Sequence, residues 1–410
     1  MFISCSTRSG KTALTAMLVF WLALSSFAAT ISSRHESRSA HKIKEAPSTE
    51  KRMAANRHSR PVQRAHARPG ARKAVAGKAA RRHARTWERF TASSYASDPA
   101  EGDMTAGEDP VVRAAALSAL GSMNGTVVAI DPSNGRILAM VNQRLALSSG
   151  AQPCSTIKVS VALAALSEGI VTKDTPVNLG GFHMDMNQAL AHSNNQYFEA
   201  LGRRLGFQKV SYYAHQFGLG ELAGWNLRGE HLGEYPAQEI PASEGGVAKM
   251  CSFGEGVSMT PLQLGALMAS IANGGTLYYL QHPTSAAEVA SFQPHVKRYL
   301  DIAPLIPEVS VGMLGATQYG TARSLRTNFT SEQVLGKTGT CSAAGTRFGW
   351  FGSFSNSQYG RIVTVIFLRG DHAVYGPKAA ELAGRFYHNL DEEHYFAGRS
   401  TPVHAAAVRR

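Results

Sequence analysis

One stretch decides how the chain folds: residues 153–169 have the sequence PCSTIKVSVALAALSEG. Alanine and leucine dominate it and apolar residues recur at helical spacing, which predicts a helix from Ser155 to about Glu168 that ends at Gly169. Ser155 then lies at the positive end of the helix dipole, and Lys158 follows one turn later on the same face. A hydroxyl and an amine held in this way can act as a nucleophile and its base.

A plainer interpretation is a helix-capping serine followed by a lysine that points into solvent. The Ser-x-x-Lys pattern is short enough to recur by chance. It does recur in this chain, at Ser39–Lys42 and Ser48–Lys51, both within a polar region. The choice between a catalytic pair and a cap therefore depends on the rest of the chain.

A second polar group follows at Ser193 and Asn195, in a segment of helical character. A serine hydroxyl can relay a proton, and an asparagine can donate and accept hydrogen bonds without carrying charge. The same residues are equally suited to a polar helix junction, and Ser-x-Asn also occurs at Ser122–Asn124. This motif alone identifies no function.

The third group is the sequence KTGT at residues 337–340, inside a strand-like run. On a strand, Lys337 and Gly339 would face one side, and Thr338 and Thr340 the other. Gly339 would leave room for another backbone to approach closely. The amine and the hydroxyls could bind a carboxylate, whereas the plainer interpretation is a solvated strand end.

Strand-like sequences lie at both ends of the folded region, with helical sequences between them. The first two strands flank a turn at Asn134-Gly135, which is a strong hairpin signal. This order predicts an α+β domain in which an antiparallel sheet is closed by N- and C-terminal strands and carries an inserted helical subdomain. The expected strands are 125–132, 137–142, 334–341, 346–354 and 361–368, and the expected helices are 111–120, 186–206, 261–273, 308–325 and 377–390.

Positive charge is concentrated near the N-terminus. Residues 31–87 hold 16 of the 42 Lys and Arg against 3 Asp and Glu, whereas residues 88–410 hold 24 basic and 26 acidic residues. We therefore expect a basic, disordered linker over residues 31–108, which either binds anionic envelope polymers or is a plain spacer. Because the excess charge lies outside the folded region, we expect no nucleic-acid partner.

The N-terminus has the pattern of a targeting segment. Residues 12–29 are mostly apolar and follow Arg8 and Lys11. We interpret residues 1–30 as a secretory signal peptide or a membrane anchor. The body of the protein would then be exported, and would be either periplasmic or anchored in the inner membrane facing the periplasm. We expect the folded domain at 109–392 and a C-terminal tail at 393–410.

The three polar motifs occur in the order of a known family. They are S-x-x-K at 155–158, S-x-N at 193–195 and K-T-G at 337–339. Together with surrounding stretches such as IDPSNGRILAMVN at 130–142, they resemble the penicillin-binding protein transpeptidases, which are relatives of the serine β-lactamases. The resemblance extends over about residues 112–392, nearly all of the folded region.

The resemblance implies a chemical role for each residue of the first two motifs. Ser155 would attack the carbonyl carbon of the penultimate D-Ala in a D-Ala-D-Ala stem peptide of peptidoglycan and form an acyl-enzyme. Lys158 would be the base, which requires a pKa well below the ordinary lysine value of about 10.4. Ser193 would relay the proton to the leaving amine. Asn195 would bind the substrate amide and steady Lys158.

The third motif would bind the substrate. Lys337, Thr338 and Thr340 would hold the terminal carboxylate around Gly339, and the backbone N–H groups of Ser155 and Thr340 would form an oxyanion hole. A β-lactam would acylate the same serine. The resemblance implies no metal and no cofactor.

A disulfide is implied as well. Cys154 precedes the expected nucleophile and Cys341 follows the KTGT motif. Some carbapenem-hydrolysing class A β-lactamases resemble this pattern and join these two positions. In an oxidising compartment we expect a Cys154–Cys341 bond and a free Cys251, with two buried thiols as the alternative.

Three alternatives to a transpeptidase remain open. A serine β-lactamase needs a base that activates water, and Glu230 and Glu234 lie between the motifs, although their segment also resembles an ordinary stretch of the transpeptidases. A D,D-carboxypeptidase would perform the same acylation with water as the acceptor. A non-catalytic β-lactam or muropeptide sensor would be acylated without turnover.

Overall fold

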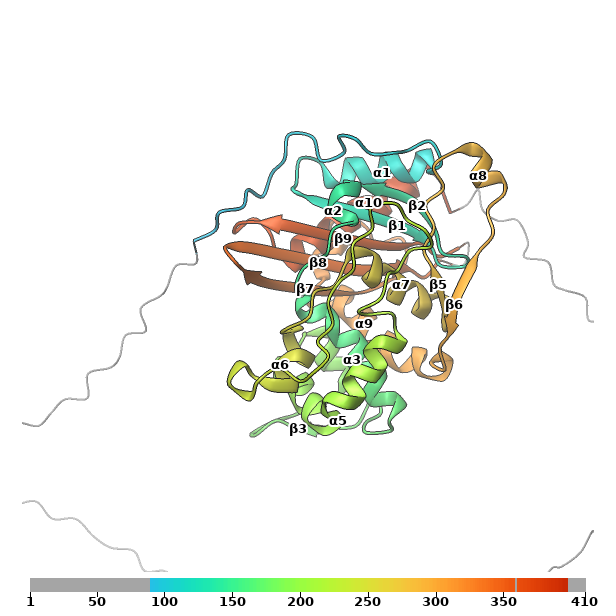
Figure 1. The fold of residues 1–410 in the computed structure, drawn as a ribbon. Coiled ribbons are helices and arrows are strands. Elements are labelled where there is room, and N and C mark those ends of the chain that lie inside the picture. Colours follow the sequence, from blue (N-terminus) through green and yellow to red (C-terminus); the bar gives the residue numbers. More distant parts are fainter. Residues whose placement is uncertain (1–88, 358–359, 397–410) are drawn as a thin grey trace, which may run out of the picture. The chain divides into compact units, whose positions relative to one another are not determined.

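The computed structural model describes residues 89–357 and 360–396, and its centre is a five-stranded antiparallel sheet (Figure 1). The strands lie in the order β2-β1-β9-β8-β7, so that a strand from the start of the domain pairs with one from its end. They are β1 (Gly125–Asp131), β2 (Arg136–Val141), β7 (Val334–Ala343), β8 (Thr346–Ser355) and β9 (Val363–Gly370). The prediction of an α+β fold with an antiparallel sheet is confirmed.

Helices cover both faces of this sheet. Helices α1 (Pro110–Leu120) and α10 (Gly376–Glu392) contact one face, and α7 (Pro261–Ala272) contacts the other (Figure 1). The remaining helices are α2 (Gln143–Ala146), α3 (Lys158–Ser167), α4 (Met186–Ala191), α5 (Asn195–Gln216), α6 (Gly246–Phe253), α8 (Ala286–Ala290) and α9 (Ile306–Gln318). Short 3-10 turns are η1 (Cys154–Ile157), η2 (Ala242–Glu244), η3 (Ala303–Leu305) and η4 (Arg323–Thr327), and two small hairpins pair β3 (Val177–Asn178) with β4 (His183–Met184) and β5 (Thr276–Tyr279) with β6 (His295–Tyr299).

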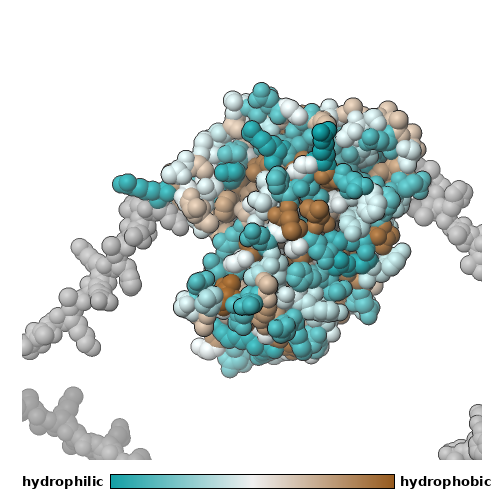
Figure 2. Space-filling model, viewed as in Figure 1, coloured by the Kyte–Doolittle hydropathy of each residue, from teal (hydrophilic) through white to brown (hydrophobic). Residues whose placement is uncertain are grey.

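The sheet separates two hydrophobic cores. In β1, Val128 and Ile130 join the core beneath α7, whereas Val127 and Ala129 join the core beneath α1 and α10. All four side chains are fully buried. A strand that is buried on both faces has a continuous apolar sequence rather than an alternating one. Figure 2 shows that apolar groups on the face drawn there form only small patches among hydrophilic ones.

Two helix starts follow from local capping. The Asp109 carboxylate accepts hydrogen bonds from the backbone N–H groups of Val111 and Val112, and Pro110 occupies the first helical turn of α1. Thr260 and Gln263 form a capping box at the start of α7. Both arrangements satisfy N–H groups that have no partner within the helix.

The helix expected at 308–325 ends earlier than its sequence pattern predicted. Helix α9 ends at Gln318, and Gly320 then packs so tightly on α4 that a Cβ atom there would lie 2.1 Å from the Ala191 carbonyl oxygen. The backbone N–H of Thr321 donates to the same oxygen at 3.0 Å. The chain turns here because α4 supplies the hydrogen bond that a continuing helix would have made.

The folded region is longer at both ends than the expected 109–392. Ser94 is fully buried, and its hydroxyl donates to the Asp371 carboxylate at 2.6 Å, while Asp103 forms an ion pair with Arg113 at 2.7 Å. At the other end, Phe396 is 5% exposed and packs in the core beneath α1 and α10. Single buried polar contacts and one aromatic side chain anchor these segments, and neither segment is an amphipathic helix or strand. Their sequences therefore show no regular spacing of apolar residues.

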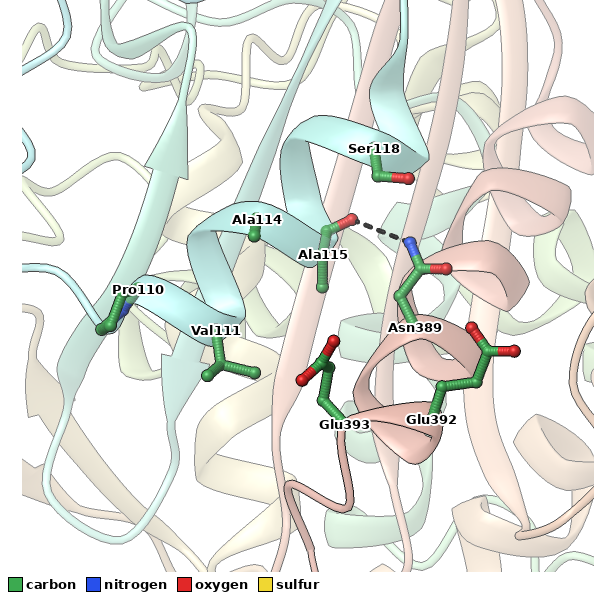
Figure 3. A pocket seen from close by; sticks show the side chains of 8 residues that line it. All are labelled: Pro110, Val111, Ala114, Ala115, Ser118, Asn389, Glu392 and Glu393. Carbon is green, nitrogen blue, oxygen red and sulfur yellow. Dashed lines mark hydrogen bonds between the residues drawn. The ribbon is translucent and has the colours of Figure 1, made fainter.

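Helices α1 and α10 lie against each other and leave a cavity of about 420 Å³ near the end of α10 (Figure 3). Pro110, Val111 and Ala114 form its apolar side, and Glu392 and Glu393 lie opposite. The Asn389 amide donates across the contact to the Ala115 carbonyl at 3.4 Å. The cavity is lined by residues of α1 and the end of α10, and none of the three motifs takes part.

Within residues 89–357 and 360–396, no helix is both long enough and apolar enough to span a bilayer. The expected targeting segment at 1–30, the basic segment at 31–87 and the end of the C-terminal tail lie outside the described residues.

Candidate active site

Ser155 lies in the 3-10 turn η1, immediately before α3, rather than in the first turn of one continuous α-helix. Contacts on both sides anchor this turn. The Thr156 hydroxyl donates to the Pro153 carbonyl at 2.6 Å, and Cys154, whose φ is +52°, forms a disulfide with Cys341 on β7. Ser155 itself remains partly exposed, so its hydroxyl is held at a fixed place and stays accessible.

Lys158 is the first residue of α3, and it is fully buried. Its Nζ lies 3.1 Å from the Ser155 Oγ and 2.6 Å from the Asn195 Oδ1. It also lies 2.8 Å from the Ser193 carbonyl oxygen and 3.2 Å from the Ser193 Oγ. The structure therefore brings the first two motifs together around one amine.

The segment expected as a helix at 186–206 is broken where the second motif lies. Ser193 has a φ of +57°, which is uncommon for a residue other than glycine, and it separates α4 from α5. Asn194 caps α5 by accepting a hydrogen bond from the backbone N–H of Tyr197 at 2.9 Å. Because of this break, the carbonyl and hydroxyl of Ser193 and the side chain of Asn195 reach the same amine.

Lys337 is on β7 and is also fully buried. Its Nζ donates to the Ser193 Oγ at 2.8 Å and to the Thr338 carbonyl at 2.9 Å. The Ser193 hydroxyl thus lies between the amines of Lys158 and Lys337. A helix start, a helix junction and a strand, far apart in the sequence, meet at this one oxygen atom.

Burial and neighbouring charge change the protonation of both amines. The pKa of Lys158 is lowered to about 6, first because burial disfavours the ammonium form and next because Lys337 is close, while the Glu199 carboxylate opposes the shift. Burial lowers the pKa of Lys337 to about 7. At neutral pH the Lys158 amine is therefore mainly neutral, and it can accept a proton from an adjacent hydroxyl.

Gly339 permits the close contact between β7 and the Ser155 turn. A Cβ atom at this position would lie 2.8 Å from the Pro153 carbonyl oxygen and 3.3 Å from the Cys154 Cβ. Gly339 is therefore needed to keep β7 and the Ser155 turn at their present separation. The Cys154–Cys341 disulfide links the same two segments, with a Cα–Cα distance of 5.6 Å.

The two threonines of the KTGT motif face away from Lys337. The Thr340 hydroxyl accepts a hydrogen bond from the backbone N–H of Gly376, at the start of α10, at 2.7 Å. The Thr338 hydroxyl lies 2.7 Å from the Thr321 hydroxyl. Their side chains are thus oriented by neighbouring elements before any substrate is bound.

Sequence reasoning missed two residues that contact or influence this site. Thr321 contacts Thr338 from the turn after α9, and no sequence signal marks it apart from the preceding Gly320. Glu199 raises the pKa of Lys158 from the second turn of α5. Its position four residues after Asn195, on the same helix face, was an available signal.

The two acidic residues considered as a base for hydrolysis have other surroundings. The Glu230 carboxylate accepts hydrogen bonds from the backbone N–H groups of Ala223 and Gly224 at 2.8–3.2 Å. Glu234 is exposed. Neither carboxylate has a hydrogen bond to Ser155 or Lys158 among the contacts of the described residues.

In the part of the chain that the structure describes, no group of three or more His, Cys, Asp or Glu side chains is arranged to hold a metal ion. The polar groups that meet in the cleft are amines, hydroxyls and one amide.

Two curated proteins from different bacteria are similar to this chain. The chain is 28% identical to the Stage V sporulation protein D of Bacillus subtilis over 256 residues, which is 52% of this chain and 39% of that protein. It is 27% identical to the peptidoglycan D,D-transpeptidase MrdA of Acinetobacter baumannii over 367 residues, which is 70% of this chain and 53% of that protein. The chain thus spans about half the length of these relatives or less.

Among solved structures, the fold is similar to that in the crystal structure of Pseudomonas aeruginosa PBP2 in complex with WCK 5153. The TM-score is 0.60 at 21% sequence identity, over 72% of this chain and 81% of that one. The family described as "Penicillin binding protein transpeptidase domain" matches residues 125–388, a range that contains all three motifs and all five strands of the central sheet. The chain belongs to the penicillin-binding protein transpeptidase family.

Proposed function

We propose that this protein is a serine D,D-transpeptidase that forms an acyl-enzyme at Ser155 with D-Ala-D-Ala stem peptides of peptidoglycan. The observation that carries the proposal is the 3.1 Å separation between the Ser155 hydroxyl and the buried Lys158 amine, whose pKa is lowered to about 6. A neutral amine at this distance is a suitable base for a serine nucleophile.

In the first step, the Lys158 amine takes the Ser155 proton while the Ser155 oxygen attacks the carbonyl carbon of the penultimate D-Ala. The resulting oxyanion accepts hydrogen bonds from the backbone N–H groups of Ser155 and Thr340, each worth about 3–4 kcal/mol in comparable acyl transfer. The C–N bond then breaks, and the proton passes from Lys158 through the Ser193 hydroxyl to the leaving D-Ala amine. The 3.2 Å distance from the Lys158 amine to that hydroxyl supports this route.

The substrate is held by groups on both walls of the cleft. Lys337 supplies positive charge for the terminal carboxylate. The Thr338 and Thr340 hydroxyls would turn from their present partners, Thr321 and Gly376, to bind the same group. Asn195 binds the substrate amide and orients Lys158, which it contacts at 2.6 Å. In the second step an amine of another stem peptide attacks the ester carbonyl, and Ser155 is released with its proton restored.

A β-lactam would enter the same reaction and stop after acylation, because its ring-opened leaving group remains attached. No contact of the described residues favours rapid hydrolysis, since the Glu230 carboxylate binds backbone N–H groups instead of a position beside Ser155. We therefore favour a transpeptidase over a β-lactamase, whereas a carboxypeptidase and a sensor share the acylation step and are separated by the test below.

The substrate also defines the compartment, because peptidoglycan is assembled outside the cytoplasm. Export by residues 1–30, either as a cleaved signal peptide or as a retained anchor, follows from their sequence. Attraction of residues 31–87 to anionic envelope polymers remains a prediction from composition alone.

The test uses the full chain and a Ser155→Ala control. Wild-type protein should be labelled covalently and stoichiometrically by a fluorescent penicillin, whereas Ser155→Ala should not be labelled. With a D-Ala-D-Ala pentapeptide and a D-amino acid, mass spectrometry should then detect the exchanged peptide and released D-Ala. Release of hydrolysed penicillin, release of D-Ala without exchange, or an inert adduct would instead indicate a β-lactamase, a carboxypeptidase or a sensor.

A further inference from the structure

An aromatic pair lies outside the candidate active site, on the long segment that joins α5 to α6 and on the neighbouring β5–β6 hairpin. The Trp225 ring stacks on the His295 ring, with centroids 4.2 Å apart and 15° between the planes, and the Tyr279 ring contacts its edge at 5.2 Å. Trp225 is nevertheless 42% exposed. We call Trp225 and His295 the aromatic ridge.

Two hollows meet at this ridge. Cavities of about 730 and 430 Å³ both have Trp225, Asn226 and Leu227 in their walls. Each volume is within the range of sites that bind small molecules. Both cavities adjoin the same indole, so a ligand of several linked units could occupy both and contact this ring, which suits a polymer better than a single small ligand.

The segment that carries Trp225 is anchored by a half-buried carboxylate. Glu230 accepts hydrogen bonds from the backbone N–H groups of Ala223 and Gly224, and the backbone N–H of Trp225 donates to the Leu280 carbonyl at 2.8 Å. A Cβ atom at Gly224 would lie 2.5 Å from the Glu230 carboxylate. The acyl-transfer mechanism has no use for Glu230, whereas fixing an exposed indole in advance reduces the entropy lost on binding a ligand.

The polar groups around the ridge favour an uncharged ligand. Glu221 forms ion pairs with Lys297 and Arg298 at 2.6 and 2.7 Å, and Glu230 supplies a second carboxylate in the same cavity wall, so two acidic groups balance two basic ones. Among the described residues, Arg228 has no carboxylate partner, and Asn226 projects from the same loop with its polar side chain exposed. Amide and guanidinium groups beside an exposed indole can bind hydroxyl and acetamido groups while the ring covers an apolar face.

We propose that the aromatic ridge and its two cavities bind the sugar chain of peptidoglycan, with one ring stacked on Trp225. Sugar rings combine apolar faces with hydroxyl and acetamido groups, which matches this mixture of groups. The proposal rests on the proposed function, because that function brings the glycan strand attached to the stem peptide to this protein. The ridge would hold the polymer while the peptide reaches Ser155.

The experiment is isothermal titration calorimetry of the full chain with peptide-free glycan strands prepared from peptidoglycan. Their muramic acid carboxylates are first converted to amides, so that the strands are uncharged, as they are when the stem peptide is attached. Wild-type protein should bind, and Trp225→Ala should weaken binding by at least about tenfold. Trp225→Phe, which keeps a smaller ring, should have an intermediate affinity. Tyr299→Ala is the matched control, because Tyr299 is 79% exposed on the same hairpin and lines neither cavity, and it should bind as wild type does.

Equal affinities for wild type, Trp225→Phe and a normally folded Trp225→Ala would overturn the proposal, as would an absence of binding by wild type. Thermal unfolding of each variant checks that the fold is intact. Penicillin labelling of wild type separates this proposal from the proposed function. Glycan binding without labelling would overturn the acyl-transfer proposal alone, and labelling without glycan binding would overturn the ridge proposal alone.

Discussion

Two groups of buried charged side chains in this domain are built in opposite ways. Near the start of α1, Arg113 contacts Asp103 at 2.7 Å and Glu108 at 3.2 Å, and Glu108 also contacts His282 at 2.9 Å. Around the Ser193 hydroxyl, by contrast, Lys158 and Lys337 form no ion pair with any carboxylate of the described residues.

The difference is the one expected between charged groups with a structural role and groups with the catalytic role that we propose. A buried charge with a partner is tolerated, and removal of that partner is strongly destabilising. A buried amine without a carboxylate partner lowers stability, and it is retained where its shifted pKa serves a reaction. The paired group anchors residues 103–108 to the sheet, whereas the unpaired group keeps an amine neutral beside Ser155.

The largest expected effect comes from Lys158→Met, which removes the base. Acylation by penicillin should slow by about a thousandfold, because general-base assistance to the Ser155 hydroxyl is lost. Stopped-flow measurement with a fluorescent penicillin reports this rate. A variant that reacts as fast as wild type would contradict the role of Lys158.

The same variant should be more stable than wild type, by about 1–4 kcal/mol at pH 6. Because the folded-state pKa of about 6 lies below the unfolded value of 10.5, the unfolded chain binds more protons between these pH values. The destabilisation by Lys158 is therefore complete below about pH 6 and disappears as the pH rises toward 10.5. Urea unfolding should show that the variant exceeds wild type in free energy of unfolding by less at pH 9 than at pH 6. A variant less stable than wild type at pH 6 would contradict the difference drawn here between paired and unpaired buried groups.

Removal of a charge from the paired group should act in the opposite direction. Arg113→Met should lower the free energy of unfolding by about 3–5 kcal/mol, because the buried Asp103 carboxylate loses its ion-pair partner and Glu108 keeps only its contact with His282. The matched control is Arg385→Met, which breaks a half-exposed pair with Glu381 and should lower it by less than about 1 kcal/mol. Similar losses of free energy of unfolding in the two variants would show that burial does not make the Arg113 ion pairs more important for stability than an exposed pair.

Reduction of the Cys154–Cys341 disulfide tests whether this bond offsets the loss of stability caused by the two buried amines without carboxylate partners. The bond joins positions 187 residues apart, and its loss should lower the free energy of unfolding by about 2–4 kcal/mol. Alkylation and peptide mapping under denaturing, non-reducing conditions should label Cys251, and Cys5 where residues 1–30 are retained, but neither Cys154 nor Cys341. Labelling of Cys154 or Cys341 before reduction would contradict the bond.

The pH dependence of acylation should reflect both amines. The rate should rise about tenfold per pH unit up to about pH 6, where Lys158 becomes neutral. It should fall again above about pH 7, where Lys337 loses the positive charge that binds a carboxylate. Because the two amines interact, the rising and falling parts of the pH–rate profile give apparent pKa values that belong to the pair of amines rather than to either residue. Rates from pH 5 to 9 with no rising limb would exclude Lys158 as the base.

The smallest expected effect is that of Thr321→Val. The substitution removes the hydroxyl that contacts Thr338 at 2.7 Å, so substrate binding should weaken about threefold to tenfold. KM should rise while kcat stays close to the wild-type value, and Thr330→Val, at an exposed position nearby, should change neither. An unchanged KM would show that Thr321 does not orient Thr338.

Much of the site was predictable because its groups are set by short spacings. Ser155 and Lys158 are three residues apart on consecutive helical turns, and Lys337 and Thr338 take opposite faces of a strand. Such relations need only local geometry. The convergence of the three motifs on Ser193 was expected from the family resemblance, since no local rule brings a helix junction to a strand.

The parts that were not predicted depend on contacts between distant segments. Ser193 adopts a positive φ, although the surrounding sequence has helical character. Thr321 follows the end of α9, where a hydrogen bond to Ala191 overrides an apolar pattern that continues. Ser94 and Asp103 lie in a stretch without periodicity and are buried through partners on other segments.

The position of β9 in the sheet has a consequence for biogenesis. This strand pairs with β1 on one side and β8 on the other, yet it is made only when synthesis reaches residues 363–370. A nascent chain that already contains Ser155, Lys158 and Lys337 therefore still lacks the strand that joins the two halves of its sheet. The sheet cannot be completed before residues 363–370 are made, so a chain terminated before them would carry every proposed catalytic group and still be a target for proteolysis rather than a partial catalyst.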